Sequence, residues 1–131
     1  MQVKQILIVD DSEIIQQRLT EQLSNIQNIE VLNPVSSISE AINTYNKFHP
    51  GIVILDIQLA DGIGFEVLDV IKKQNPETIV IVFTNYAQAG FRKRSLDGGA
   101  DFFIDKSNGY ISIYDFIRWF AQDHSSERVS L

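Results

Sequence analysis

Short runs of branched apolar residues alternate along this chain with segments in which apolar residues recur every three to four positions. The runs cover residues 6–9, 29–32, 52–55, 79–83 and 101–104. Runs of this length are typical of strands buried on both faces, which are the strands of parallel sheets. Strands that alternate with helices predict βαβ units. We therefore expect an α/β fold built from five βα units.

Residues typical of helix ends lie between these runs. Ser37 and Glu40 have the spacing of a capping box, and we expect Gly62 and Gly64 to open the third helix. Asn75-Pro76 then closes that helix. The first helix carries its apolar positions at Ile15, Leu19, Leu23 and Ile26, and the last two helices cover about 88–96 and 111–122.

Few topologies connect five βα units through right-handed crossovers. The commonest small one is a single doubly wound parallel sheet with the strand order 2-1-3-4-5. In this order the first and third strands are neighbours, and the chain reverses direction between them. A crevice opens at their carboxyl ends, where open α/β sheets bind ligands.

Length and composition indicate one domain and exclude several classes of protein. With 131 residues, 44% of them hydrophobic, the chain suffices for one core, which we place at 1–122, followed by a polar tail at 123–131. Cysteine is absent and no apolar run approaches a membrane span, so we expect a cytoplasmic protein. The net charge of −6 opposes direct binding to nucleic acid.

Polar side chains follow four of the five runs. Asp10 and Asp11 follow the first, Asp56 the third, Thr84 the fourth and Lys106 the fifth. Because the carboxyl ends of parallel strands share one edge of the sheet, we expect these side chains to meet. Three carboxylates, a hydroxyl and an ammonium together predict a site for a divalent cation and a phosphoryl group.

The charges of this set indicate its chemistry. Three adjacent carboxylates repel one another unless protons or a cation compensate them, and Mg²⁺ prefers such oxygen ligands. Since Mg²⁺ needs only one or two carboxylates, the remaining one is free to attack phosphorus and form an aspartyl phosphate. The Lys106 ammonium can stabilise the transferring oxygens, and Thr84 can donate one hydrogen bond.

Each residue alone has a plainer interpretation. Asp11 or Ser12 could simply cap the first helix, Thr84 could be an ordinary strand-end hydroxyl, and Lys106 a solvated cation. Asp56 is harder to explain in this way, because an acid that closes an apolar strand is costly without solvent or a partner. The functional interpretation depends on the combination.

The five positions, in this order and at these strand ends, resemble the receiver domain of two-component response regulators, in its chemotaxis-regulator-like, stand-alone form. The resemblance implies a flavodoxin-like fold and a phosphoryl group accepted by Asp56 from a histidine kinase or a histidine phosphotransfer protein. It also implies that Mg²⁺ is held by the acids and the backbone carbonyl of Gln58, that Thr84 and Lys106 bind the phosphoryl group, and that Phe103 turns inward when Thr84 moves. The acids concerned are Asp10, Asp11 and Asp56.

The chain departs from the family pattern at three positions. Ala60 replaces the usual proline, so we expect a less rigid loop after Asp56. Ser107 replaces the proline that usually follows the lysine in this family, and the peptide bond between that lysine and proline is typically cis. Without proline a cis peptide bond costs about 2.5–4 kcal/mol. We therefore expect either a trans bond with a rearranged loop or a strained cis bond. Phe103 lacks the hydroxyl of the tyrosine found in many members, so its two orientations should differ through packing alone.

Four further residues receive expected roles. Trp119 lies on the outer side of the last helix, where it either folds over its own surface or contacts a partner. The resemblance favours an interface on the fourth helix, fifth strand and fifth helix, to which we also assign Phe116. It further implies that Gln58 and Tyr86 tune the lifetime of the phosphoryl group, which we expect to last from minutes to hours.

We expect the chain to be a signalling switch that is activated by phosphorylation and is not a metabolic enzyme. Its downstream partner would be another protein or a second copy of the chain. The alternative is an interaction or dimerisation module with the same fold that no longer uses phosphorylation. A phosphohydrolase is disfavoured, because Gln58 stands where dehalogenase-type enzymes carry a second aspartate and no cap segment is present.

Overall fold

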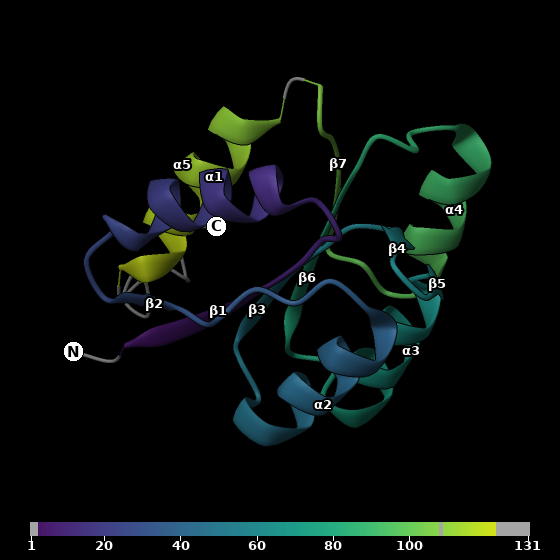
Figure 1. Cartoon of the computed structure of the whole chain (residues 1–131), viewed down its shortest axis with the longest axis horizontal. Helices are drawn as coiled ribbons and strands as arrows, with labels where there is room; N and C mark the ends of the chain where they lie inside the picture. Colours follow the sequence, from purple (N-terminus) through teal and green to yellow (C-terminus); the bar gives the residue numbers. More distant parts are fainter. Residues whose placement is uncertain (1–2, 108, 123–131) are drawn as a thin grey trace, which may run out of the picture.

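The computed structural model describes residues 3–107 and 109–122. Five strands form one parallel sheet in the order β2-β1-β3-β6-β7 (Figure 1). They are β1 (Lys4–Val9), β2 (Ile29–Val31), β3 (Ile52–Leu55), β6 (Ile79–Thr84) and β7 (Phe102–Asp105). Because β6 and β7 are the predicted fourth and fifth strands, the order 2-1-3-4-5 is confirmed.

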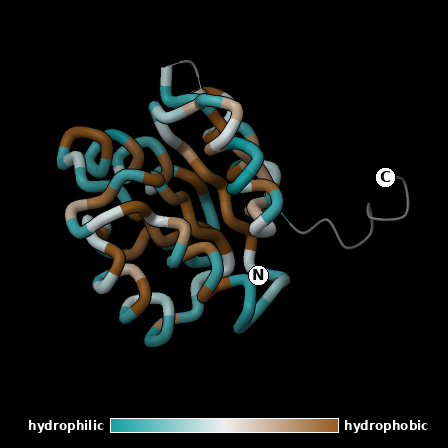
Figure 2. The backbone as a smooth tube through the Cα atoms, turned by 90° about the vertical axis from the view of Figure 1, so that its right-hand side faces the viewer, coloured by the Kyte–Doolittle hydropathy of each residue, from teal (hydrophilic) through white to brown (hydrophobic). Residues whose placement is uncertain are grey.

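Helices cover both faces of the sheet (Figure 1). One face is covered by α1 (Glu13–Ser24) and α5 (Tyr110–Ala121), and the other by α2 (Ile38–Phe48), α3 (Phe65–Gln74) and α4 (Ala89–Asp97). Alternate residues of β1 point to opposite faces of the sheet. Ile6 and Ile8 pack with α1 and α5, whereas Leu7 and Val9 pack with α2 and α3. In Figure 2 the apolar strands accordingly lie inside and polar segments outside.

Local caps fix where the first two helices begin. Ser12 accepts a hydrogen bond from the N–H of Ile15, and Ser37 accepts one from the N–H of Glu40. The Glu40 carboxylate in turn accepts from Ser36 N and Ser37 Oγ, so the predicted capping box forms with its return backbone bond from Ser36, one residue before the N-cap. The N–H of Ser36, followed by the Ser37 hydroxyl, lowers the pKa of Glu40 below its usual value.

The expectation that Gly62 opens the third helix is wrong. Gly62 belongs to a short antiparallel hairpin of β4 (Gln58–Leu59) and β5 (Gly62–Ile63), and α3 begins after Gly64. Gly62 has a φ of 145°, which favours glycine. A Cβ on Gly64 would lie 3.0 Å from the Asp56 carbonyl oxygen, so glycine allows the helix to start close to the end of β3. Both glycines thus shape the loop that carries Asp56.

Within the described part of the chain, no helix is long and apolar enough to cross a membrane. The polar tail expected at 123–131 lies outside the described residues.

Candidate functional site

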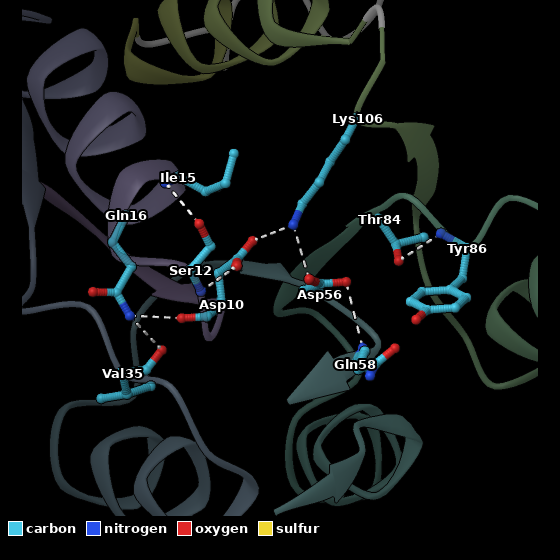
Figure 3. A network of polar contacts seen from close by, with 10 residues as sticks. All are labelled: Asp10, Ser12, Ile15, Gln16, Val35, Asp56, Gln58, Thr84, Tyr86 and Lys106. Atoms are coloured by element: carbon cyan, nitrogen blue, oxygen red, sulfur yellow. Dashed lines mark hydrogen bonds and ion pairs between the residues drawn. The ribbon is translucent and has the colours of Figure 1, made fainter. Parts of the chain in front are cut away.

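Three carboxylates meet at the carboxyl edge of the sheet (Figure 3 shows two of them, Asp10 and Asp56). Val9 of β1 is paired with Leu55 of β3, so the residues that follow these two strands are neighbours. One carboxylate oxygen from each of Asp10, Asp11 and Asp56 lies within 4.8 Å of the others. Asp10 and Asp56 are buried, with 2% and 6% of their surface exposed, whereas Asp11 is exposed. These acids can hold a metal ion between them.

Lys106 reaches the two buried acids from the end of β7. Its Nζ lies 2.7 Å from Asp10 Oδ2 and 2.8 Å from Asp56 Oδ2 (Figure 3). Burial disfavours the ammonium, but the hydrogen bonds to the two carboxylates outweigh it and raise the pKa of Lys106. For Asp10, burial disfavours the charged carboxylate and raises its pKa, although the hydrogen bonds from Lys106 and from Ser12 N lower it. Lys106 is therefore charged at neutral pH and serves as the counterion of the acids.

The loop that follows Lys106 adopts the first of the two expected conformations. No cis peptide bond occurs among residues 3–107 and 109–122, so the Lys106–Ser107 bond is trans. Ser107 N donates to Asp105 Oδ1 at 2.9 Å, and this bond lowers the pKa of Asp105. A Cβ on Gly109 would collide with the side chain of Ile104, so the chain at Gly109 passes close to β7. The backbone N–H of Lys106 donates to the Thr84 carbonyl at 3.0 Å, which holds Lys106 at the end of β7 without proline.

Thr84, Gln58 and Tyr86 lie on the other side of Asp56 (Figure 3). Thr84 ends β6 with a fully buried side chain, and its hydroxyl accepts the N–H of Tyr86 at 3.1 Å. The Tyr86 ring packs edge-on against Phe91 of α4, with centroids 5.8 Å apart. The Gln58 N–H approaches Asp56 Oδ1 at 3.4 Å. Gln58 thus contacts Asp56 directly, and Thr84 and Tyr86 lie on the same side of this acid (Figure 3).

The other predicted residues lie away from the acids, on α5 and β7. Phe103 is half-buried, and the Arg92 guanidinium lies 5.5 Å from its ring centre. Phe116 lies between Phe102, at 4.9 Å between ring centroids, and Trp119, at 6.0 Å. Trp119 remains 42% exposed, as its position on the helix predicted.

Two contacts of the site were missed by the sequence interpretation. Gln16 of α1 donates to the Asp10 carbonyl at 2.6 Å and to the Val35 carbonyl at 3.3 Å. Ala60 N donates to the Ser36 carbonyl at 3.0 Å, a bond that proline could not make because it lacks an N–H. Gln16 carries no sequence signal, since a polar residue on an amphipathic helix normally faces solvent. Ala60 drew attention only as a missing proline.

Comparison with known proteins agrees with this geometry. Residues 6–118 match the model of the response regulator receiver domain, and the chain belongs to this family. It is 30% identical over 113 residues to the response regulator protein VraR of Staphylococcus epidermidis, an alignment that covers 86% of the chain and 54% of VraR. The chain thus spans about half the length of the curated relatives it matches.

Two solved structures are similar along nearly the whole chain. A CheY-like receiver domain protein from Methanospirillum hungatei JF-1 is 27% identical, with a TM-score of 0.84, and the alignment covers 95% of this chain and 98% of that one. The non-phosphorylated HemR receiver domain from Leptospira biflexa is 30% identical, with a TM-score of 0.77 and coverage of 90% and 93%. The chain is accordingly a receiver domain of the kind found in two-component response regulators.

Proposed function

We propose that this receiver domain is a switch that is turned on by phosphorylation of Asp56. The observation that carries the proposal is the buried Asp56 carboxylate, held by Lys106 beside two further acids. An Asp56 oxygen forms a bond to the phosphorus of a phosphohistidine while the P–N bond breaks. The imidazole nitrogen leaves with the electron pair and takes up a proton. The donor would be a histidine kinase or a histidine phosphotransfer protein, and a cytoplasmic location belongs to the same proposal.

The donor set fits Mg²⁺, because it consists of three carboxylates, two buried and one exposed, whose oxygens lie within 4.8 Å of one another. Asp10, Asp11 and Asp56 would hold the ion together with the backbone carbonyl of Gln58. When bound, Mg²⁺ supplies positive charge for the oxygens of the transferring phosphoryl group. Lys106 contributes an ammonium on the side of β7, and Thr84 contributes a hydroxyl at the end of β6.

Intact-mass measurement after incubation with acetyl phosphate or phosphoramidate tests the proposal. A single phosphoryl adduct that requires Mg²⁺ is expected. A phosphorylation-independent interaction module, the second candidate, would show no adduct under any metal condition. The intact acceptor set favours the switch.

We infer that the Tyr86 ring slows hydrolysis of the phosphoryl group by screening water. Its place beside Thr84, packed on Phe91, supports this role. Tyr86→Ala should shorten the expected lifetime of minutes to hours, whereas Tyr86→Phe, which keeps the ring, should not. Loss of the adduct is timed by mass after the donor has been removed. Equal or slower decay in Tyr86→Ala would refute the screening role.

We further infer that the switch signals through α4, β7 and α5, either to a protein partner or to a second copy of the chain. The ring of Phe116 backs the exposed rings of Phe102 and Trp119 there. Large rings in a continuous patch are common in interfaces. The inward turn of Phe103 that the resemblance implies would reach this surface along β7, the strand that carries Phe103.

Trp119→Ala should weaken self-association of the phosphorylated protein by about tenfold or more, within the range of an aromatic hot spot. Sedimentation velocity across a range of concentrations measures it. Ile14→Ala is the matched control, because Ile14 is an apolar residue on α1 that is 74% exposed. If Trp119→Ala leaves both self-association and partner binding unchanged, the assignment of this surface as an interface is contradicted.

A further inference from the structure

Residues 35–37, in the segment between β2 and α2, contact both halves of the acidic site. On one side the Val35 carbonyl accepts the N–H of Asp10 at 3.0 Å, and Gln16 bridges the carbonyls of both residues. On the other side the Ser36 carbonyl accepts the N–H of Ala60. The segment therefore joins the acid that follows β1 to the loop that follows β3.

Asp61 makes the second contact on the side of that loop. Its Oδ1 accepts the N–H of Ile38 at 2.6 Å, and its Oδ2 accepts the N–H of Ser39 at 3.3 Å. These N–H groups belong to the first turn of α2, where a carboxylate is favourable. The bond from Ile38 lowers the pKa of Asp61, so the group is ionised at neutral pH. Asp61 therefore caps the helix α2 from a position more than 20 residues away in the sequence.

Asp61 also lies at the turn of the β4–β5 hairpin, whose first residue is Gln58. The hairpin contains two residue pairs, Gln58 with Ile63 and Leu59 with Gly62. A hairpin this short is not stable alone and takes its position from what it packs against. Gly62 supports the same contact, because a Cβ there would lie 3.4 Å from Ile38 Cδ1. The position of the Gln58 backbone thus depends on where the turn is fixed.

We propose that Asp61 is a positioning residue of the phosphorylation site. By binding the first turn of α2, it sets the distance between the Gln58 carbonyl and Asp10, and hence the fit of a metal ion between them. The inference rests on the proposed function, since it assigns the Gln58 carbonyl to the metal. Residues that orient metal ligands commonly change affinity when they are replaced.

Mg²⁺ titration by calorimetry of the folded protein tests this role, with three variants. Asp61→Ala should weaken Mg²⁺ binding by about tenfold, the lower end for residues that orient ligands. Asp61→Asn keeps one acceptor oxygen for Ile38 and should lie between Asp61→Ala and the unchanged chain. Ser37→Ala is the matched control, because Ser37 caps the same helix without contacting the hairpin through its side chain. It should lower the melting temperature and leave Mg²⁺ affinity unchanged.

Phosphorylation gives a second measure. In Asp61→Ala the rate of adduct formation from acetyl phosphate should fall at low Mg²⁺ and recover at high Mg²⁺, whereas in Ser37→Ala it should not change. If Asp61→Ala binds Mg²⁺ as tightly as the unchanged chain, or if Asp61→Ala and Ser37→Ala lose Mg²⁺ affinity equally, the positioning role of Asp61 is overturned. The proposed function is not affected by either result. If Asp61→Ala does not fold, Asp61→Asn decides by the same comparison. An unchanged chain that neither binds Mg²⁺ nor gains an adduct overturns the proposed function itself.

Discussion

Asp56→Asn is expected to abolish phosphoryl uptake from acetyl phosphate. The amide keeps the size and hydrogen-bonding capacity of the side chain but is a far weaker nucleophile than the carboxylate. Of the two buried acids that pair with Lys106, Asp56 is the one whose Oδ1 accepts the N–H of Gln58. Intact mass after incubation with Mg²⁺ should show no adduct under conditions that label the unchanged chain.

Asp69→Asn is the matched control for this experiment. Asp69 lies on α3, is exposed and pairs with Arg94 at 2.7 Å, away from the acidic site. This variant should gain the adduct at the normal rate. An Asp56→Asn protein that still gains one adduct at the normal rate would show that another residue is the acceptor.

Lys106→Met is expected to destabilise the metal-free fold by about 3 kcal/mol, because removing one partner of a buried ion pair leaves uncompensated charge. Two buried carboxylates, Asp10 and Asp56, would then face each other without their counterion. Methionine fills the space of the lysine stem, so lost packing contributes little. Urea unfolding followed by circular dichroism measures the change in free energy.

Mg²⁺ should restore part of this stability. A cation that binds only the folded state stabilises it, and in Lys106→Met it no longer competes with an ammonium for Asp10 and Asp56. The stabilisation by Mg²⁺ should therefore be larger in the variant than in the unchanged chain, while adduct formation is slower. Lys93→Met is the control: its pair with Asp97 at 2.7 Å is exposed, so its loss should change stability little. Equal stability of Lys106→Met and the unchanged chain would contradict the role of Lys106 as counterion.

The parts of the fold that the sequence predicted are those set by local patterns. The branched apolar runs predicted all five strands of the sheet, and their order followed from the handedness of βα connections. Polar residues directly after those runs, such as Asp10 and Asp56, had to share one edge because parallel strands end together. Proximity of the acids followed from chain direction without any knowledge of side-chain packing.

The parts that were missed depend on contacts between distant segments. Gly62 looked like the start of a helix, since a two-residue strand such as Gly62–Ile63 is too short to produce an alternating pattern. Asp61 received no role from the sequence, because its partners at Ile38 and Ser39 lie more than 20 positions earlier in the chain. Lys106 was expected to meet the acids, but its simultaneous bonds to Asp10 and Asp56 are a detail of side-chain geometry that sequence patterns do not encode.

The double contact of Lys106 has a consequence for the resting protein. The single ammonium of Lys106 offsets part of the repulsion between the two buried acids before any dissolved cation binds. Removal of divalent metals by a chelator should therefore prevent the proposed phosphorylation of Asp56 while the domain stays folded.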